Sequence, residues 1–145
     1  MKKANRRILN QAFTLVEMLL VLVILAVLAA IVIPKFAGRS QQAKVTAAQS
    51  QIAGFEMALD SFEVDTGSYP KGNNGLNALV QMPSGATNWR GPYLKKGIPA
   101  DPWGNAYVYN YPGKNNADGY DIMSMGPDGR VGGDDDINNW DDAKL

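Results

Sequence analysis

The chain has 145 residues, with fourteen acidic and fourteen basic side chains and a formal net charge of zero. This length is enough for about one domain. Cysteine and histidine are both absent, which excludes disulfides and thiolate chemistry and removes the commonest general base of enzymes. Because Walker A and serine-elbow motifs are absent as well, we expect a protein that is not an enzyme.

The first 33 residues of the chain are a basic leader followed by a long apolar stretch. Its 21 residues, Phe13 to Ile33, contain one ionisable side chain, Glu17. About 20 apolar residues cross a hydrocarbon core of about 30 Å. A carboxylate within such a segment costs roughly 2.5–3.5 kcal/mol near the bilayer centre, so it persists where a partner or a function uses it. Glu17 is therefore a functional candidate.

Three interpretations fit this N-terminal region. A secretory signal cleaved near residues 27–29 is disfavoured, because the apolar core exceeds the usual 7–15 residues. A permanent membrane anchor fits the length but leaves Glu17 unexplained. The third is a prepilin leader, because residues 12–17, Ala-Phe-Thr-Leu-Val-Glu, resemble the type IV prepilin motif. That resemblance implies cleavage between Ala12 and Phe13, N-methylation of Phe13, and pairing of Glu17 with the amine of a neighbouring subunit. Ala12 stands where the family nearly always has glycine.

A second apolar pattern predicts that the same helix continues into the polar part of the chain. A helix from Thr14 to about Glu63 would be about 75 Å long at 1.5 Å per residue. Because Pro34 removes a backbone hydrogen bond and Gly38 follows it, we expect a kink or a locally melted turn there, or a helix break at the membrane surface. The apolar residues, spaced three or four apart on one stripe, are Val45, Ala48, Ile52, Phe55, Leu59 and Phe62.

Turn residues at 66–70 end this helix, and residues 75–80 predict a short second helix. Residues 106–111 and 120–125 have strand composition, with a polar hairpin loop at 112–119. One long helix on a small antiparallel sheet is an α+β fold. Four aromatic residues are expected to pack in the core and its loops rather than to form a ligand platform: Trp89, Tyr93, Trp103 and Trp140.

An acidic loop follows the second predicted strand. Residues 124–137 contain four aspartates and four glycines and no lysine. Mutual repulsion would hold such a loop open, whereas Ca²⁺ accepts six to eight oxygen ligands in flexible geometry. The spacing is not that of an EF-hand. Two other interpretations stay open, a helix cap at residues 134–136 and a solvated acidic tail.

Several motifs in the second half of the chain together resemble the major pseudopilin of type II secretion, the G subunit of a type IV pilin-like superfamily. They are Asp-Pro-Trp-Gly-Asn-x-Tyr at 101–107, Ser-x-Gly-Pro-Asp-Gly at 124–129, Asp-Asp-Ile at 135–137 and Asn-Trp at 139–140. The resemblance implies a type IV pilin-like fold with a calcium-ordered C-terminal loop. The implied ligands are Asp128, Asp135 and Asp136, with Ser124 and a carbonyl of Met123 or Val131 as weaker matches.

The resemblance also predicts domains and partners. Residues 1–12 would be a cleaved leader, 13–35 a transmembrane and filament-core helix, and 36–145 a periplasmic globular domain. Without the leader, ten basic and fourteen acidic residues remain, a net charge of −4, which argues against a nucleic-acid partner. The expected partners are further copies of the chain, a prepilin peptidase, minor pseudopilins, and an inner-membrane assembly platform with its ATPase.

We therefore expect the major subunit of a pseudopilus in a Gram-negative bacterium. It would be held in the inner membrane by one pass before it polymerises in the periplasm to promote export of folded proteins. Two alternatives remain at this stage. One is a type IV pilus subunit for adhesion, twitching or DNA uptake, although such pilins commonly carry a disulfide. The other is a membrane-anchored calcium-dependent binding module that does not polymerise.

Overall fold

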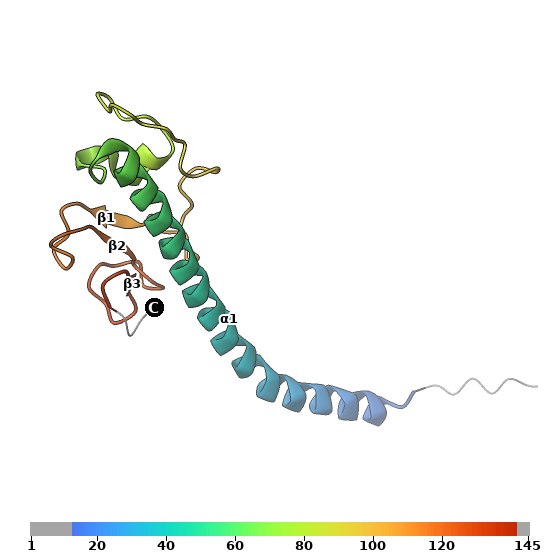
Figure 1. Cartoon of the computed structure of the whole chain (residues 1–145). Helices are drawn as coiled ribbons and strands as arrows, with labels where there is room; N and C mark the ends of the chain where they lie inside the picture. Colours follow the sequence, from blue (N-terminus) through green and yellow to red (C-terminus); the bar gives the residue numbers. More distant parts are fainter. Residues whose placement is uncertain (1–12, 142–145) are drawn as a thin grey trace, which may run out of the picture. The chain divides into compact units, whose positions relative to one another are not determined.

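The computed structural model describes residues 13–141, apart from the side chains of residues 33–37, 73 and 74. The chain divides after Ser40 into two compact units. One helix, α1 (Leu15–Thr66), contributes to both units and is coloured blue to green in Figure 1. Its 52 residues include Pro34 and Gly38. The predicted long helix is therefore confirmed, and the backbone is helical at the position where a melted turn was one expectation.

The later part of α1 carries the main core of the second unit. Five residues of the predicted stripe are buried, and Val45 packs against them while partly buried. Phe55 meets Tyr107 edge-on with ring centroids 5.0 Å apart, and Phe62 meets Tyr93 in the same way at 5.6 Å. The spacing of the apolar residues therefore predicted correctly which face of α1 is buried. The five buried residues are Ala48, Ile52, Phe55, Leu59 and Phe62.

The helix ends where the turn residues predicted. Gly67 follows Thr66 with φ of +83°, a conformation that glycine adopts without the steric cost of a Cβ. Its N–H donates to the carbonyl of Glu63 over 2.7 Å, which satisfies one of the last helical carbonyls. The next element is a 3₁₀ helix, η1 (Gly72–Leu79). It begins three residues before the predicted short helix and buries Leu76, Ala78 and Leu79.

Three short strands form an antiparallel sheet beside α1 (Figure 1). They are β1 (Val108–Asn110), β2 (Asp121–Ser124) and β3 (Ile137–Asn138), in the order β1-β2-β3. Tyr109 lies opposite Ile122, and Ser124 lies opposite Ile137. The two predicted strands are confirmed but shorter than expected, and β3 was not predicted.

The fold is thus α+β, with one long helix on a small sheet, as predicted. Three of the aromatic residues assigned to packing do pack against the core while partly buried, namely Trp89, Tyr93 and Trp103. The Trp89 indole N–H donates to the carbonyl of Ala78 over 2.9 Å, which joins the middle segment to η1. Trp140 is half-buried.

Candidate functional site

The first turn of α1 places Glu17 at a defined helix terminus. Thr14 precedes the helix, and its Oγ1 accepts a hydrogen bond from the backbone N–H of Glu17 over 3.2 Å. Threonine is a favoured residue at this position because its side chain satisfies an N–H that the helix leaves free. A carboxylate in the first turn is also favoured by the positive end of the helix dipole. Phe13 lies just ahead of this cap, and Ala12 lies outside the described residues.

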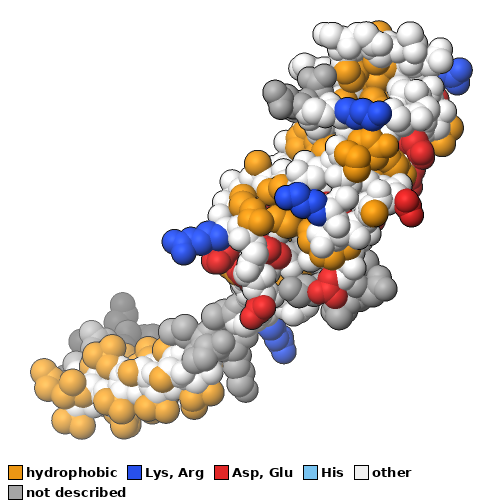
Figure 2. All heavy atoms as spheres, turned by 90° about the vertical axis from the view of Figure 1, so that its left-hand side faces the viewer, with side chains coloured by type: hydrophobic (Ala, Val, Ile, Leu, Met, Phe, Trp, Pro, Cys, Tyr) orange, Lys and Arg blue, Asp and Glu red, His pale blue; other side chains and the backbone are white. Residues whose placement is uncertain are grey.

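The first unit exposes apolar side chains on every side of the helix. All residues from Phe13 to Val32 are exposed, and the 18-residue window Leu15–Val32 is long and apolar enough to cross a membrane. Apolar side chains cover the visible face of this helix in Figure 2. A helix that is apolar all round is stable where lipid or protein covers it. The segment is therefore built for burial outside its own chain.

In the second unit, the pairing of β2 with β3 brings the two ends of the acidic loop together. Ser124, the last residue of β2, pairs with Ile137, the first residue of β3, so residues 125–136 leave and re-enter the sheet side by side. Within the loop, the backbone of Gly126 passes against Asp135. A Cβ on Gly126 would collide with the Asp135 carbonyl oxygen, and φ of +62° at Gly126 also favours glycine. The loop is therefore folded back on itself.

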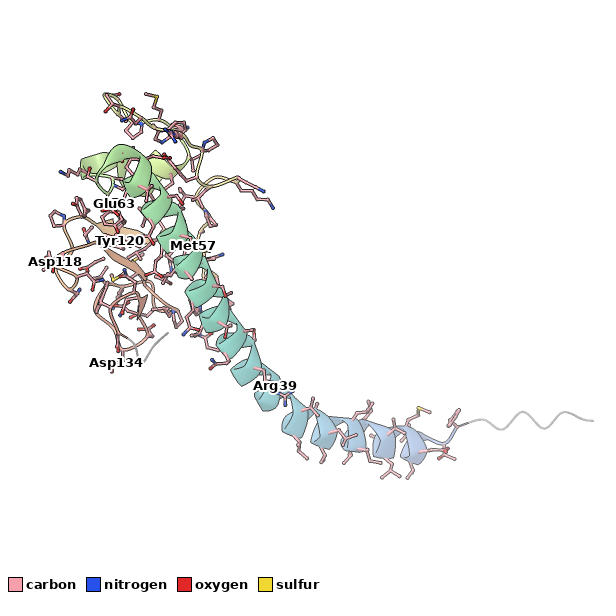
Figure 3. The ribbon with its side chains drawn as sticks, viewed as in Figure 1. Arg39, Met57, Glu63, Asp118, Tyr120 and Asp134 are labelled. Atoms are coloured by element: carbon pink, nitrogen blue, oxygen red, sulfur yellow. The ribbon has the colours of Figure 1, made fainter. Side chains whose placement is uncertain are left out.

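This fold brings two of the predicted metal ligands together. Asp135 Oδ2 accepts the backbone N–H of Asp128 over 3.2 Å. A Cβ placed on Gly133 would meet Asp135 Oδ1 and would lie 3.5 Å from Asp128 Oδ2, so both carboxylates converge on that point. Asp128 Oδ1 accepts the N–H of Arg130 over 2.8 Å. Asp134 is labelled in this loop in Figure 3, well apart from Asp118 in the hairpin loop.

The third predicted ligand, Asp136, follows Asp135 in the chain, and its side chain is buried. It is 7% exposed, and its Oδ2 accepts the N–H of Gly132 over 2.8 Å. Within the described part of the chain, its Oδ1 is buried without a hydrogen-bond partner. Residues 134–136 also line a groove of about 440 Å³ whose other wall includes glutamines of α1. An unpaired buried carboxylate oxygen is costly unless something binds it.

These donors suit a hard cation such as Ca²⁺. All three side chains offer carboxylate oxygens, and each oxygen has lone pairs beyond those used by the N–H groups. Across the described residues, however, no group of three or more acidic side chains is close enough to hold a metal ion as it stands. Asp128 and Asp135 are brought together, whereas Asp136 accepts the N–H of Gly132. Ion binding would thus require the loop to tighten.

The weaker ligand candidates have other contacts. The Ser124 hydroxyl is fully buried and donates to Asp101 Oδ2 over 2.6 Å. Met123 is paired on both sides within the sheet, opposite Val108 and Asn138. Val131 is exposed in the loop. Their roles as ligands stay predictions.

A second buried aspartate organises the hairpin loop and was not singled out from the sequence. Asp121, the first residue of β2, is 4% exposed. Burial disfavours its charged form, but N–H groups of Asn115, Asn116 and Lys114 outweigh burial and lower the pKa of Asp121. The three backbone N–H groups donate over 2.7–2.9 Å. A single carboxylate therefore satisfies three successive loop amides.

Comparison with known proteins assigns this architecture to a class. The model of the family described as type II secretion system (T2SS), protein G, matches residues 35–140, and that of the prokaryotic N-terminal methylation motif matches residues 9–33. The crystal structure of the major pseudopilin from the type 2 secretion system of enterohaemorrhagic Escherichia coli is similar, with a TM-score of 0.61 and 34% identity. The match covers 72% of this chain and 92% of that one. Helix and sheet thus define a pseudopilin.

Sequence comparison with individual relatives identifies the family of this chain more narrowly. The chain is 45% identical over 139 residues to the type II secretion system core protein G of Pseudomonas aeruginosa, covering 91% of this chain and 96% of that protein. It is 43% identical over 134 residues to the core protein G of Escherichia coli strain K12, covering 90% and 91%. The chain belongs to the type II secretion system protein G family and is a subunit of the type II secretion pseudopilus. This family is structural rather than enzymatic, and neither alternative from the sequence is favoured.

Proposed function

We propose that this chain polymerises with copies of itself into the main body of a periplasmic pseudopilus that promotes export of folded proteins. The observation that carries the proposal is the exposed apolar helix, Phe13–Val32. Before assembly, lipid of the inner membrane covers this surface, and in the filament the helices of neighbouring subunits cover it. The further components of the system would be minor pseudopilins and an assembly platform with its ATPase. The ATPase would supply the energy, because the chain carries no nucleotide-binding motif of its own.

Processing creates the charge that Glu17 needs. Cleavage between Ala12 and Phe13 by a prepilin peptidase leaves an amine on Phe13, which is then methylated. That positive amine and the Glu17 carboxylate of a neighbour offset each other's burial, as paired charges within membranes do. The mass of the mature chain tests this step. The mass expected for a chain that begins at methylated Phe13 supports this step. The mass of a chain that begins at residue 1, or after Ala29, rules it out.

Chemical cross-linking of intact cells tests assembly. Wild-type chain should give a ladder of multimers, and Glu17→Leu and Glu17→Gln should both lose it, because neither side chain carries the negative charge that offsets the charge of a buried amine. Glu17→Gln keeps the size of the side chain, which separates loss of charge from loss of packing. Leu20→Ile is the matched control on the same exposed helix and should keep the ladder. A full ladder from both Glu17 variants would contradict the proposal.

We propose further that Ca²⁺ binds the acidic loop through Asp128, Asp135 and Asp136 and replaces the disulfide that many small exported domains use. Support comes from the convergence of Asp128 with Asp135 and from the buried, unpartnered oxygen of Asp136. When bound, the ion would neutralise the mutual repulsion of these carboxylates. The ordered loop would then stabilise the pairing of β2 with β3.

Thermal unfolding of the full chain in detergent tests the calcium proposal. Extracellular modules bind calcium with a Kd of about 10⁻⁴–10⁻³ M. A ligand at 100 times its Kd stabilises the folded state by about 2.7 kcal/mol, so Tm should rise clearly in about 10 mM calcium if the Kd lies at the tighter end of this range. Asp136→Asn should abolish the rise, whereas Asp118→Asn in the hairpin loop should preserve it. Equal Tm values with calcium and with chelator would refute the proposal.

A further inference from the structure

A buried carboxylate connects the start of the acidic loop to a turn that lies more than twenty residues earlier. Asp101 is 4% exposed. Its Oδ1 accepts the backbone N–H groups of Trp103 and Asn105 over 3.0 and 2.7 Å. Its Oδ2 accepts the Ser124 hydroxyl over 2.6 Å, which is short for a hydrogen bond and typical of a charged acceptor. Asp101 therefore holds its own turn and the end of β2 at once.

The same connection continues into the loop at Gly126. The Ser124 Oγ accepts the N–H of Gly126 over 3.2 Å, and the side-chain amide of Asn105 donates to the carbonyl of Gly126 over 3.3 Å. The N–H and the carbonyl of Gly126 are therefore both fixed by residues that bond to Asp101, namely Ser124 and Asn105. Gly126 in turn packs against the backbone of Asp135, where a Cβ would collide. The position of Asp135 thus depends on contacts that begin at Asp101.

We propose that Asp101, Asn105 and Ser124 are positioning residues, which fix the backbone of the acidic loop at Gly126 and so support calcium binding by Asp135 without contacting the ion. This inference rests on the calcium role proposed above. It assigns the Ser124 hydroxyl to Asp101 rather than to the metal, unlike the weaker match drawn from the sequence. Groups that orient metal ligands through hydrogen bonds typically change metal affinity by about 10–100-fold when they are removed.

The test is calcium titration of the full chain in detergent by calorimetry, with Asp101→Asn, Ser124→Ala and the double variant. An amide has only one acceptor oxygen, so it cannot accept from the turn N–H groups and from the Ser124 hydroxyl together. Each single variant should bind calcium at least about tenfold more weakly. The double variant should be no weaker than the worse single variant, because both changes break one connection.

The matched control is Asp121→Asn, which alters an equally buried aspartate that holds the hairpin loop instead. It should lower Tm in chelator but leave the calcium affinity unchanged. Asp101→Asn should also reduce the rise in Tm that calcium produces, which a general loss of stability would not do. If Asp101→Asn left the calcium affinity unchanged while Ser124→Ala weakened it, Ser124 would be a direct ligand. That result would overturn the positioning inference but not the calcium proposal. Absence of calcium binding by the unaltered chain would overturn the calcium proposal itself.

Discussion

At the scale of single residues, the aspartates of the second unit differ by what surrounds them rather than by their chemistry. Asp121 receives three backbone N–H groups and needs nothing further. Asp128 and Asp135 converge with few donors between them, and Asp136 keeps one buried oxygen unpartnered. The same side chain therefore serves as a loop organiser in one place and as a candidate cation ligand in another.

The lowered pKa of Asp121 predicts how its contribution depends on pH. A carboxylate with a lowered pKa in the folded state stabilises fully above the ordinary Asp value of about 3.9. That stabilisation is lost as pH falls toward the lowered value, because the unfolded chain then binds more protons. Asp121→Asn should cost about 1–3 kcal/mol at pH 7 and should flatten the acid side of the stability profile. Urea unfolding at pH 7 and near pH 3 measures both effects, and a parallel profile for the variant would contradict this account.

Residue roles were only partly predictable from the sequence. The density of aspartates without a lysine indicated a candidate cation-binding loop, and the resemblance to the family selected residues 128, 135 and 136 from it. Two of these three carboxylates converge. The connection between Asp101 and Ser124 was not predicted, because the two residues are 23 positions apart and no local spacing indicates their contact. Asp121 was assigned only to a strand, since alternation of residue types does not reveal which side chain bonds a neighbouring loop.

At the scale of elements, helix periodicity was the most informative signal. The stripe from Ala48 to Phe62 is buried as its spacing predicts, because a 3.6-residue period is maintained over many turns. Strand bounds were predicted less well, since β1 and β2 are shorter than the predicted 106–111 and 120–125 at both ends. The short strand β3 was missed because two residues, Ile137 and Asn138, are too few to show alternation.

Two residues of α1 provide a direct test of which face stabilises the fold. Leu59 is completely buried, whereas Met57, two positions earlier and labelled in Figure 3, is 69% exposed. Leu59→Ala should lower the free energy of unfolding by about 2–5 kcal/mol, because it leaves a cavity in the core. Met57→Ala should change it by no more than about 0.5 kcal/mol. Chemical unfolding of the full chain in detergent measures both, and similar losses would mean that the buried face is assigned wrongly.

At the scale of the whole molecule, the two units satisfy different requirements. The second unit has its own core of α1, η1 and the sheet. The first unit has an apolar surface that its own chain leaves exposed. In the filament proposed above, the second unit keeps its own core while lipid or other subunits cover the first unit.

In the proposed filament, sibling subunits bury the helix of the first unit, and a single introduced cysteine can report on that burial. Because the chain has no cysteine of its own, Leu22→Cys places one reactive thiol on the exposed apolar helix. We expect this thiol to be protected from maleimide in isolated filaments and to react once detergent dissociates the same filaments. Equal reaction rates in filaments and in detergent-dissociated subunits would contradict it.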